Sequence, residues 1–232
     1  MDKKIVLVTG TRKGIGKYIV MYYASLGYQV IGCSRKNIEY KCENYRHFCL
    51  DICDEFEVKK MFRIIRKTYG KIDVLINNAG IASMNHAMLT TIDVVRNILN
   101  TNVVGTFLFS REAAKLMQRN KFGRIINFST VASPLKLEGE AIYAASKAAV
   151  VNLTEILARE FAEMGITVNA LGPTPVKTDL IKSVPQNKLD QLIKRQALKR
   201  YGSFDDIVNV LDFFIQPQSS FITGQVIYLG GV

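Results

Sequence analysis

The sequence predicts an α/β fold, in which a doubly wound parallel sheet of about seven strands carries helices on both faces. Short runs of aliphatic and β-branched residues alternate with longer amphipathic stretches along the whole chain, as in repeated βαβ units. The first apolar run, residues 5–8, is continuous, which is typical of a strand buried on both faces. A glycine-rich turn follows it directly. No repeat or linker interrupts the pattern, so we expect residues 1–232 to form one domain.

The expected elements follow from apolar periodicity and from turn residues. Strands are expected at 5–8, 28–33, 44–50, 72–76, 124–128, 166–171 and 225–229. Helices are expected at 17–26, 55–69, 91–117 with a break near Gly105, 143–164 and 204–215, with short helices between 179 and 200. Asp54 is a candidate cap for the second helix, whose expected apolar face contains Phe56, Val58, Phe62 and Ile65.

Composition narrows the class of protein. The chain has 48% hydrophobic residues, a net charge of +11, four cysteines and two histidines. No apolar run reaches the ~18 residues of a membrane span, and no C-x-x-C pair or histidine cluster indicates a metal site. Basic residues are interspersed with acidic ones, and no nucleic-acid-binding motif is present. We therefore expect a cytoplasmic protein with reduced cysteines that binds no metal, membrane or nucleic acid.

The turn after the first strand reads T-G-T-R-K-G-I-G over residues 9–16. Gly10 permits a tight turn, Gly14 permits close approach of the backbone to a phosphate, and Gly16 permits close packing of helix on strand. The following helix would direct its N-terminus at a pyrophosphate. The spacing is G-x-x-x-G-x-G, which differs from the G-x-G-x-x-G fingerprint. A ligand-free glycine turn is the alternative, but the strand-turn-helix context favours a dinucleotide site.

Residues at the ends of the next strands indicate which dinucleotide binds. Arg35 stands after the second strand where an NAD site has an acid, and Arg12 and Lys13 add positive charge. An arginine suits the 2′-phosphate of NADP. A solvated basic loop is the alternative, and NAD is the alternative cofactor. Asp51 follows the third strand, and N-N-A-G follows the fourth at 77–80, where ligands gather in such sheets.

Tyr143 and Lys147 lie in the stretch A-I-Y-A-A-S-K-A-A, residues 141–149. Residues four apart share a helix face, and a nearby cation favours the phenolate. We therefore expect Lys147 to lower the pKa of Tyr143, which would suit the tyrosine to acid/base catalysis. An ordinary packed helix is the alternative, because this spacing alone is common.

Taken together, these motifs resemble those of the short-chain dehydrogenase/reductases. T-G-x-x-x-G-I-G, N-N-A-G, Asn102, Y-x-x-x-K and the closing I-T-G-Q at 222–225 appear in that family's order. The chain is most similar in general appearance to 3-oxoacyl-carrier-protein reductases and their sugar- and alcohol-acting relatives. The resemblance implies a single-domain Rossmann fold and an oxidoreductase.

The resemblance also implies roles for individual residues. Tyr143 would be the acid/base, and Lys147 would bind the nicotinamide ribose. Asn102 would hold a water in a proton relay. The family's catalytic serine position falls on Thr130, and Ser129 precedes it. Because adjacent side chains of a strand point to opposite faces, only one hydroxyl can face the tyrosine, and we expect it to be Thr130.

The cofactor site implied by the resemblance includes residues from most strand ends. The expected set is Gly10, Arg12, Lys13, Gly14, Ile15, Gly16, Arg35, Asp51, Ile52, Asn78, Ala79, Gly80, Tyr143, Lys147, Pro173, Val176 and Thr178. One departure concerns the loop after the sixth strand, which reads P-T-P at 173–175 where the family has Pro-Gly. The glycine's conformational freedom is lost there, which puts the loop geometry in question.

The expected function is NADP-dependent reduction of a keto group on a small or carrier-bound, anionic substrate. Residues 176–200 would form a substrate lid, and their basic side chains (Lys182, Lys188, Lys194, Arg195, Lys199 and Arg200) favour an anionic partner. A solvated helix face would explain them equally well. Alternatives are action on a sugar phosphate or nucleotide sugar in surface-glycan biosynthesis, and a dinucleotide-binding regulator without activity. The resemblance implies a homotetramer or homodimer.

Overall fold

The computed structural model describes residues 3–182 and 184–232. Within them, seven strands form one sheet in the order β3-β2-β1-β4-β5-β6-β7, and every pairing is parallel. The strands are β1 Ile5–Thr9, β2 Gln29–Ser34, β3 Tyr45–Cys49, β4 Val74–Asn77, β5 Gly123–Phe128, β6 Ile166–Gly172 and β7 Val226–Tyr228. The predicted doubly wound sheet is confirmed. Strand order reverses between β1 and β4, where such sheets bind ligands.

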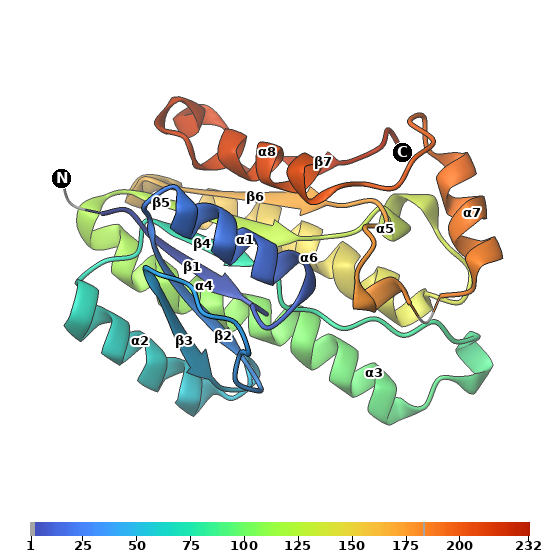
Figure 1. Cartoon of the computed structure of the whole chain (residues 1–232), viewed down its shortest axis with the longest axis horizontal. Coiled ribbons are helices and arrows are strands. Elements are labelled where there is room, and N and C mark those ends of the chain that lie inside the picture. The colour runs from blue at the N-terminus through green and yellow to red at the C-terminus, as the bar shows by residue number, and fades with distance from the viewer. Residues whose placement is uncertain (1–2, 183) are drawn as a thin grey trace.

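Helices cover both faces of the sheet (Figure 1). Alternate residues of the central strands enter two separate cores, as Ile5 and Leu7 enter one and Val6 and Val8 the other, which is why β1 is apolar on both faces. One core packs against α1 Gly14–Ser25 and α8 Phe204–Ile215. The other packs against α2 Glu55–Tyr69, α4 Gly105–Met117 and α6 Ala141–Glu160. The remaining α-helices of the described chain are α3 Ile92–Leu99, α5 Ala132–Leu135 and α7 Gln186–Arg195.

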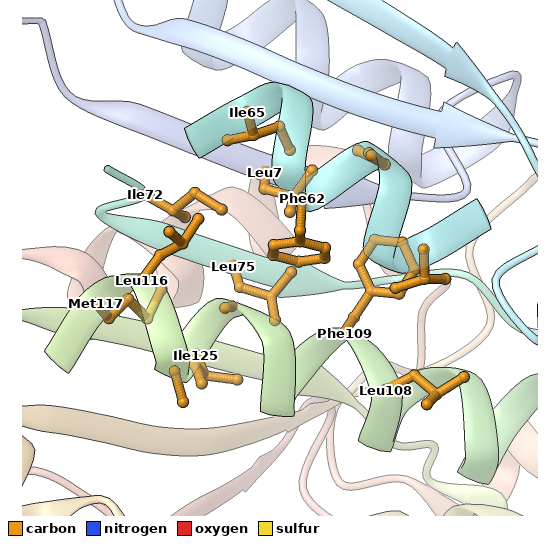
Figure 2. Packing of buried hydrophobic residues seen from close by; sticks show 14 of the residues in the cluster. Leu7, Phe62, Ile65, Ile72, Leu75, Leu108, Phe109, Leu116, Met117 and Ile125 are labelled. Atoms are coloured by element: carbon orange, nitrogen blue, oxygen red, sulfur yellow. The ribbon is translucent and has the colours of Figure 1, made fainter. Parts of the chain in front are cut away.

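The second core joins α2 to α4 through two aromatic rings. Phe62 of α2 and Phe109 of α4 meet edge to face with centroids 5.5 Å apart (Figure 2). Leu7 of β1 and Leu75 of β4 are buried in the same cluster. Burial of such side chains contributes about 1.5–3 kcal/mol each, so this contact holds the two helices on the sheet.

Helix α2 begins and ends as predicted, but one of its expected core residues is exposed. The Asp54 side chain accepts a hydrogen bond from Glu57 N at 3.0 Å, and Gly70 ends the helix with a φ of 73°. Phe56, however, is 67% exposed. It lies two residues before the buried Val58, on the opposite side of a helix with 3.6 residues per turn. Its assignment to the apolar face was wrong.

The long helix predicted at 91–117 is interrupted differently from the expectation. A π-helical segment, Asn100–Val104, separates α3 from α4, while Gly105 keeps helical angles of φ −59° and ψ −44°. Gly105 serves packing, since a Cβ there would lie 2.6 Å from Ile52 Cδ1. The widened turn places Asn102 at the centre of the π segment, where its side chain is buried. Such segments are frequent at functional sites.

Helix α6 is the one described helix that is long and apolar enough, by length and composition, to cross a membrane. It packs on β5 and β6 and carries the buried Lys147. It is therefore a helix that covers the sheet. It ends at Glu160, and a separate 3₁₀ turn, Ala162–Met164, completes the stretch predicted as one helix.

Two substitutions on α2 test the corrected helix face. Phe62→Ala removes a buried ring and should lower the free energy of unfolding by about 3–5 kcal/mol. Phe56→Ala removes an exposed ring and should change it by less than about 0.5 kcal/mol. Denaturant unfolding measures both, and a larger effect at Phe56 would contradict the packing described here.

Candidate active site

The glycine turn between β1 and α1 is built around a close approach of backbone to backbone. Gly10 and Gly14 have φ values of 74° and 58°. A Cβ on Gly16 would lie 2.2 Å from Gly10 O, so no other residue fits there. Helix α1 has no side-chain cap and no acidic residue in its first turn. Its free N–H groups and positive end suit the phosphates of a dinucleotide.

A cavity of about 600 Å³ opens beside this turn at the carboxyl ends of the strands. Most of the expected cofactor residues line it, namely Gly10, Arg12, Lys13, Gly14, Ile15, Gly16, Arg35, Asp51, Ile52, Asn78, Ala79, Gly80 and Thr178. The sequence analysis missed further lining residues, Ser34, Lys36, Leu50, Ile81, Thr101 and Asp179. We call this space the dinucleotide cavity. Its shape and its free helix end fit such a cofactor.

The basic end of this cavity is held by a histidine that sequence analysis did not single out. His47 Nε2 lies 3.2 Å from Ser34 Oγ and 3.3 Å from Lys36 O. Its Nδ1 lies 2.8 Å from Tyr45 Oη, and burial lowers its pKa. Ser34 Oγ also donates to Lys36 O at 2.7 Å. These contacts support the loop that carries Arg35, and nothing in the local sequence pattern indicates them.

The Asn78 side chain hydrogen-bonds the backbone at the start of the glycine turn. Its Nδ2 donates to Thr9 O at 2.8 Å and to Gly10 O at 3.2 Å, and Ala79 N donates to Thr9 Oγ1 at 2.9 Å. The loop after β4 is thereby tied to the loop after β1. Asp51 likewise uses one carboxylate oxygen locally, accepting a hydrogen bond from Cys53 N at 2.9 Å.

Asn102 joins three elements at the inner end of the dinucleotide cavity. Its Oδ1 accepts from Ile81 N at 2.9 Å, and its Nδ2 donates to Ile81 O at 3.0 Å and to Ser146 Oγ at 2.9 Å. The side chain is fully buried. Gly80 lies against it, since a Cβ there would be 3.2 Å from Asn102 Oδ1 and 3.3 Å from Lys147 Nζ. Asn102 therefore fixes the backbone that borders the site.

A second cavity, of about 360 Å³, adjoins the first and shares Ile15 and Thr178 with it. We call it the substrate cavity. Tyr143, Thr130, Pro173 and Val176 line it. Of the expected site residues, Asn102 and Lys147 line neither cavity. The Lys147 ammonium lies against Gly80, where a Cβ would be 3.3 Å from Nζ.

The pKa of Tyr143 differs from the expectation. Lys147 Nζ donates to Phe128 O at 2.7 Å, and burial lowers its pKa to about 8. Burial also raises the pKa of Tyr143 to about 12; the hydrogen bond with Thr130 lowers it, and the Glu140 charge raises it further. The expected lowering of the tyrosine pKa by Lys147 is therefore wrong for this structure, because burial of the phenol outweighs the other effects.

The two hydroxyls that follow β5 have different partners. Thr130 lines the substrate cavity and interacts with Tyr143. Ser129 Oγ instead donates to Lys147 O at 3.4 Å and does not line that cavity. The geometry favours Thr130 as the hydroxyl that acts with Tyr143.

Contacts within the chain hold the loop at 173–175, which reads P-T-P where the family has Pro-Gly. The Thr174 hydroxyl hydrogen-bonds the Gln196 side chain, and both residues are buried. Gly202 N donates to Pro175 O at 3.0 Å, and a Cβ on Gly202 would lie 2.7 Å from Thr174 Cγ2. The loop is thus fixed by residues that follow α7, and it keeps Pro173 and Val176 on the cavity wall.

Comparisons with known proteins agree with this geometry. Residues 10–231 match a family model described as enoyl-(acyl carrier protein) reductase. The chain is 34% identical to a 3-oxoacyl-[acyl-carrier-protein] reductase of Staphylococcus epidermidis, over 98% of each chain. The chain belongs to the short-chain dehydrogenase/reductase family. It is accordingly an oxidoreductase.

Solved structures of this family superpose over nearly the whole chain. ElxO with NADP bound is 32% identical, with a TM-score of 0.89, over 98% of this chain and 97% of that one. A 4-hydroxyisoleucine dehydrogenase complexed with NADH is 28% identical, with a TM-score of 0.88, over 99% and 98%. The seven-stranded fold with its two adjoining cavities is thus that of a short-chain dehydrogenase/reductase.

The packing at Gly16 leads to a test of the dinucleotide cavity. Gly16→Ala should weaken dinucleotide binding by at least about tenfold, because the new Cβ pushes the turn away from α1. Gly27→Ala is the control: it has a φ of 82° and an empty surrounding. It should lower stability by about 1 kcal/mol and leave affinity unchanged. Calorimetric titration with the dinucleotide measures both, and equal affinities would contradict the assignment.

Proposed function

We propose that the protein reduces the keto group of a 3-oxoacyl thioester with NADPH. The observation that carries this proposal is the pair of hydroxyls, Tyr143 and Thr130, at the wall of a cavity that adjoins the dinucleotide cavity. Similarity to 3-oxoacyl-[acyl-carrier-protein] reductases over 98% of the chain supports the substrate class. The similarity to these reductases does not favour the nucleotide-sugar alternative, and the complete set of expected catalytic residues argues against a regulator without activity.

In the proposed reaction, this chain supplies one proton and one hydrogen bond to the substrate carbonyl. NADPH, when bound, supplies the hydride to the carbonyl carbon. Tyr143, with a pKa of about 12, is protonated at neutral pH and donates its proton to the carbonyl oxygen. The Thr130 hydroxyl donates a hydrogen bond to the same oxygen, stabilising the charge that develops on it. Solvent then returns a proton to Tyr143.

Lys147 and Asn102 would assist Tyr143 and Thr130. The Lys147 ammonium lies against Gly80, where it would bind the hydroxyls of the nicotinamide ribose. Its charge would also favour the tyrosinate left after proton transfer. Asn102 Nδ2 donates both of its hydrogens, to Ile81 O and Ser146 Oγ, and Oδ1 accepts one hydrogen bond, from Ile81 N. Oδ1 therefore has one acceptor site left for the water of the proposed relay.

The preference for NADPH rests on charge at the end of β2. Arg12, Arg35 and Lys36 line the dinucleotide cavity there, and basic residues stand directly after β2 where an acid would bind a ribose 2′-hydroxyl. A solved relative with NADP bound supports this choice. A second relative is complexed with NADH, so NAD is the alternative cofactor.

The segment 176–200 is proposed as the substrate lid. Its helix α7 contributes Lys188, Leu189, Leu192 and Arg195 to the substrate cavity. Lys13 of the glycine turn and Asp179 pair at 2.9 Å, which joins the lid to the dinucleotide cavity. The basic side chains favour an anionic substrate, such as one borne on an acidic carrier protein.

Assembly and location are also proposals. Large apolar side chains are exposed along α3, the π segment, α4 and α6, namely Ile92, Leu99, Val104, Phe107 and Ile156. A second copy of the chain would bury these side chains, so their exposure supports a homotetramer or homodimer. The described cysteines are all free, which supports a cytoplasmic location.

Substitution of Tyr143 tests the function directly. Wild-type protein should oxidise NADPH in the presence of acetoacetyl thioester, and Tyr143→Phe should bind NADPH normally but turn over at least about 100-fold more slowly. Crotonyl thioester, which lacks the keto group, serves as the control substrate. Absorbance of NADPH measures the rate. Turnover of the crotonyl substrate alone, or an unimpaired variant, would reject the proposal.

The orientation of the two β5 hydroxyls gives a paired test. Thr130→Val keeps the shape but removes the hydroxyl, and should lower kcat by about 100-fold. Ser129→Ala loses one long hydrogen bond to Lys147 O and should lower kcat by less than about threefold. Steady-state kinetics on acetoacetyl thioester would reassign the role if the ranking were reversed.

Arg35 should decide the choice of cofactor. Wild-type protein should bind NADPH at least about tenfold more tightly than NADH, because charge-assisted hydrogen bonds hold the 2′-phosphate. Arg35→Ser should weaken NADPH binding and leave NADH binding little changed. Fluorescence titration measures the four affinities, and a wild-type preference for NADH would overturn the assignment.

A further inference from the structure

Glu140 occupies the N-cap position of α6 but does not cap the helix. Its φ of −113° and ψ of 24° place it just outside the helix, and its side chain accepts no hydrogen bond from the first turn. The short polar side chains that are common at this position, Ser, Thr, Asp and Asn, bond a free N–H of the helix, and the longer Glu140 side chain makes no such bond. Here the side chain turns away instead, and its Oε2 is buried without any hydrogen-bond partner among the described residues. Buried polar atoms without partners are rare and call for an explanation.

The side chain of Glu140 borders the substrate cavity, together with Tyr143 and Thr130. Its charge reaches the Tyr143 phenol, whose pKa it raises, and burial raises the pKa of Glu140 itself. It lies three residues before Tyr143, on the same side of the first turn of α6. The unpartnered carboxyl and the proposed proton donor therefore border one small space.

Basic residues of the same cavity do not neutralise this carboxyl. Lys136, Lys188 and Arg195 line the cavity, yet Oε2 receives a hydrogen bond from none of them. Arg195 Nη2 instead donates to Leu135 O at 2.6 Å. Much of the remaining wall is apolar, including Val131, Ala132, Pro173 and Leu192. An acceptor in such a wall lowers affinity for any ligand that offers it no donor.

We propose that Glu140 is a specificity-determining residue whose carboxyl group accepts a hydrogen bond from a hydroxyl or ammonium group on a carbon close to the reacting carbonyl. The preferred substrate is then a keto compound that carries such a donor, rather than a plain acyl chain. This inference rests on the proposed function, because it assumes that the reacting carbonyl faces Tyr143. A site built to bond a donor discriminates strongly against the analogue that lacks it.

Three matched ketones test the proposal: an acetoacetate ester, and the same ester with a hydroxyl or an amino group on its terminal carbon. Wild-type protein with NADPH should show a kcat/KM at least about tenfold higher for each donor-bearing ester than for the plain one. Glu140→Leu should bring both ratios to about one. Glu140→Gln keeps an acceptor but no charge, so it should retain the hydroxyl preference and lose most of the amino preference.

Glu160→Gln provides the control, because it removes the same charge from an exposed position at the other end of α6, outside both cavities. It should leave both ratios as in the wild type. Circular dichroism checks that each variant is folded. Wild-type ratios near one, or ratios unchanged in Glu140→Leu, would overturn the proposal.

A binding measurement separates this inference from the proposed function. Calorimetry compares the affinity of protein mixed with NADP⁺ for the plain hydroxy ester and for its dihydroxy counterpart, in wild type and in Glu140→Leu. A preference for the dihydroxy ester that disappears in the variant supports Glu140 even if no ester is reduced. Reduction of all three esters at similar rates, with no preference in calorimetry, supports the proposed function and rejects the role of Glu140.

Discussion

The site depends on one buried amide. Asn102 bonds both backbone groups of Ile81 and the Ser146 hydroxyl, so it joins the loop after β4 to the π segment and to α6. Leaving a buried polar partner unsatisfied costs about 1–3 kcal/mol, and these bonds have no replacement nearby. The backbone from Gly80 to Ile81 therefore stays where the two cavities meet, and Lys147 can lie against it.

Burial then sets the charges within this framework. Tyr143 is held in its neutral form and Lys147 is more easily deprotonated than a lysine in water, because desolvation disfavours the charged form of each. Thr130 and Glu140 act on the tyrosine in opposite directions. The strength of the proposed proton donor thus depends on two neighbours, Thr130 and Glu140, which both line the cavity that the substrate would fill.

Much of this arrangement could be predicted from the sequence, because it is local. Apolar periodicity located the strands and α8, Asp54 and Gly70 located α2, and strand alternation distinguished Thr130 from Ser129. The π segment could not be predicted, since the bonds that its residue Asn102 makes join segments far apart in the sequence. Phe56 shows the limit of reading apolar residues without their helical phase.

The environments of Lys147, Glu140 and Arg35 could not be predicted from the sequence either. The contact of Lys147 with Phe128 O joins residues from different elements, and helical spacing alone suggested a tyrosine partner. Glu140 follows a glycine in a polar loop, where an acid is ordinarily solvated. Its burial, like the support of Arg35 by His47, results from packing between distant segments, which sequence pattern does not record.

In the proposed reaction, hydride would pass directly from the bound dinucleotide to a carbonyl carbon beside Tyr143. Label transfer tests this most directly. NADPH carrying deuterium at the transferable nicotinamide position should give a 3-hydroxyacyl thioester with deuterium on its hydroxyl-bearing carbon, as mass spectrometry would show. A product without the label, or no product from the keto substrate, would contradict the account.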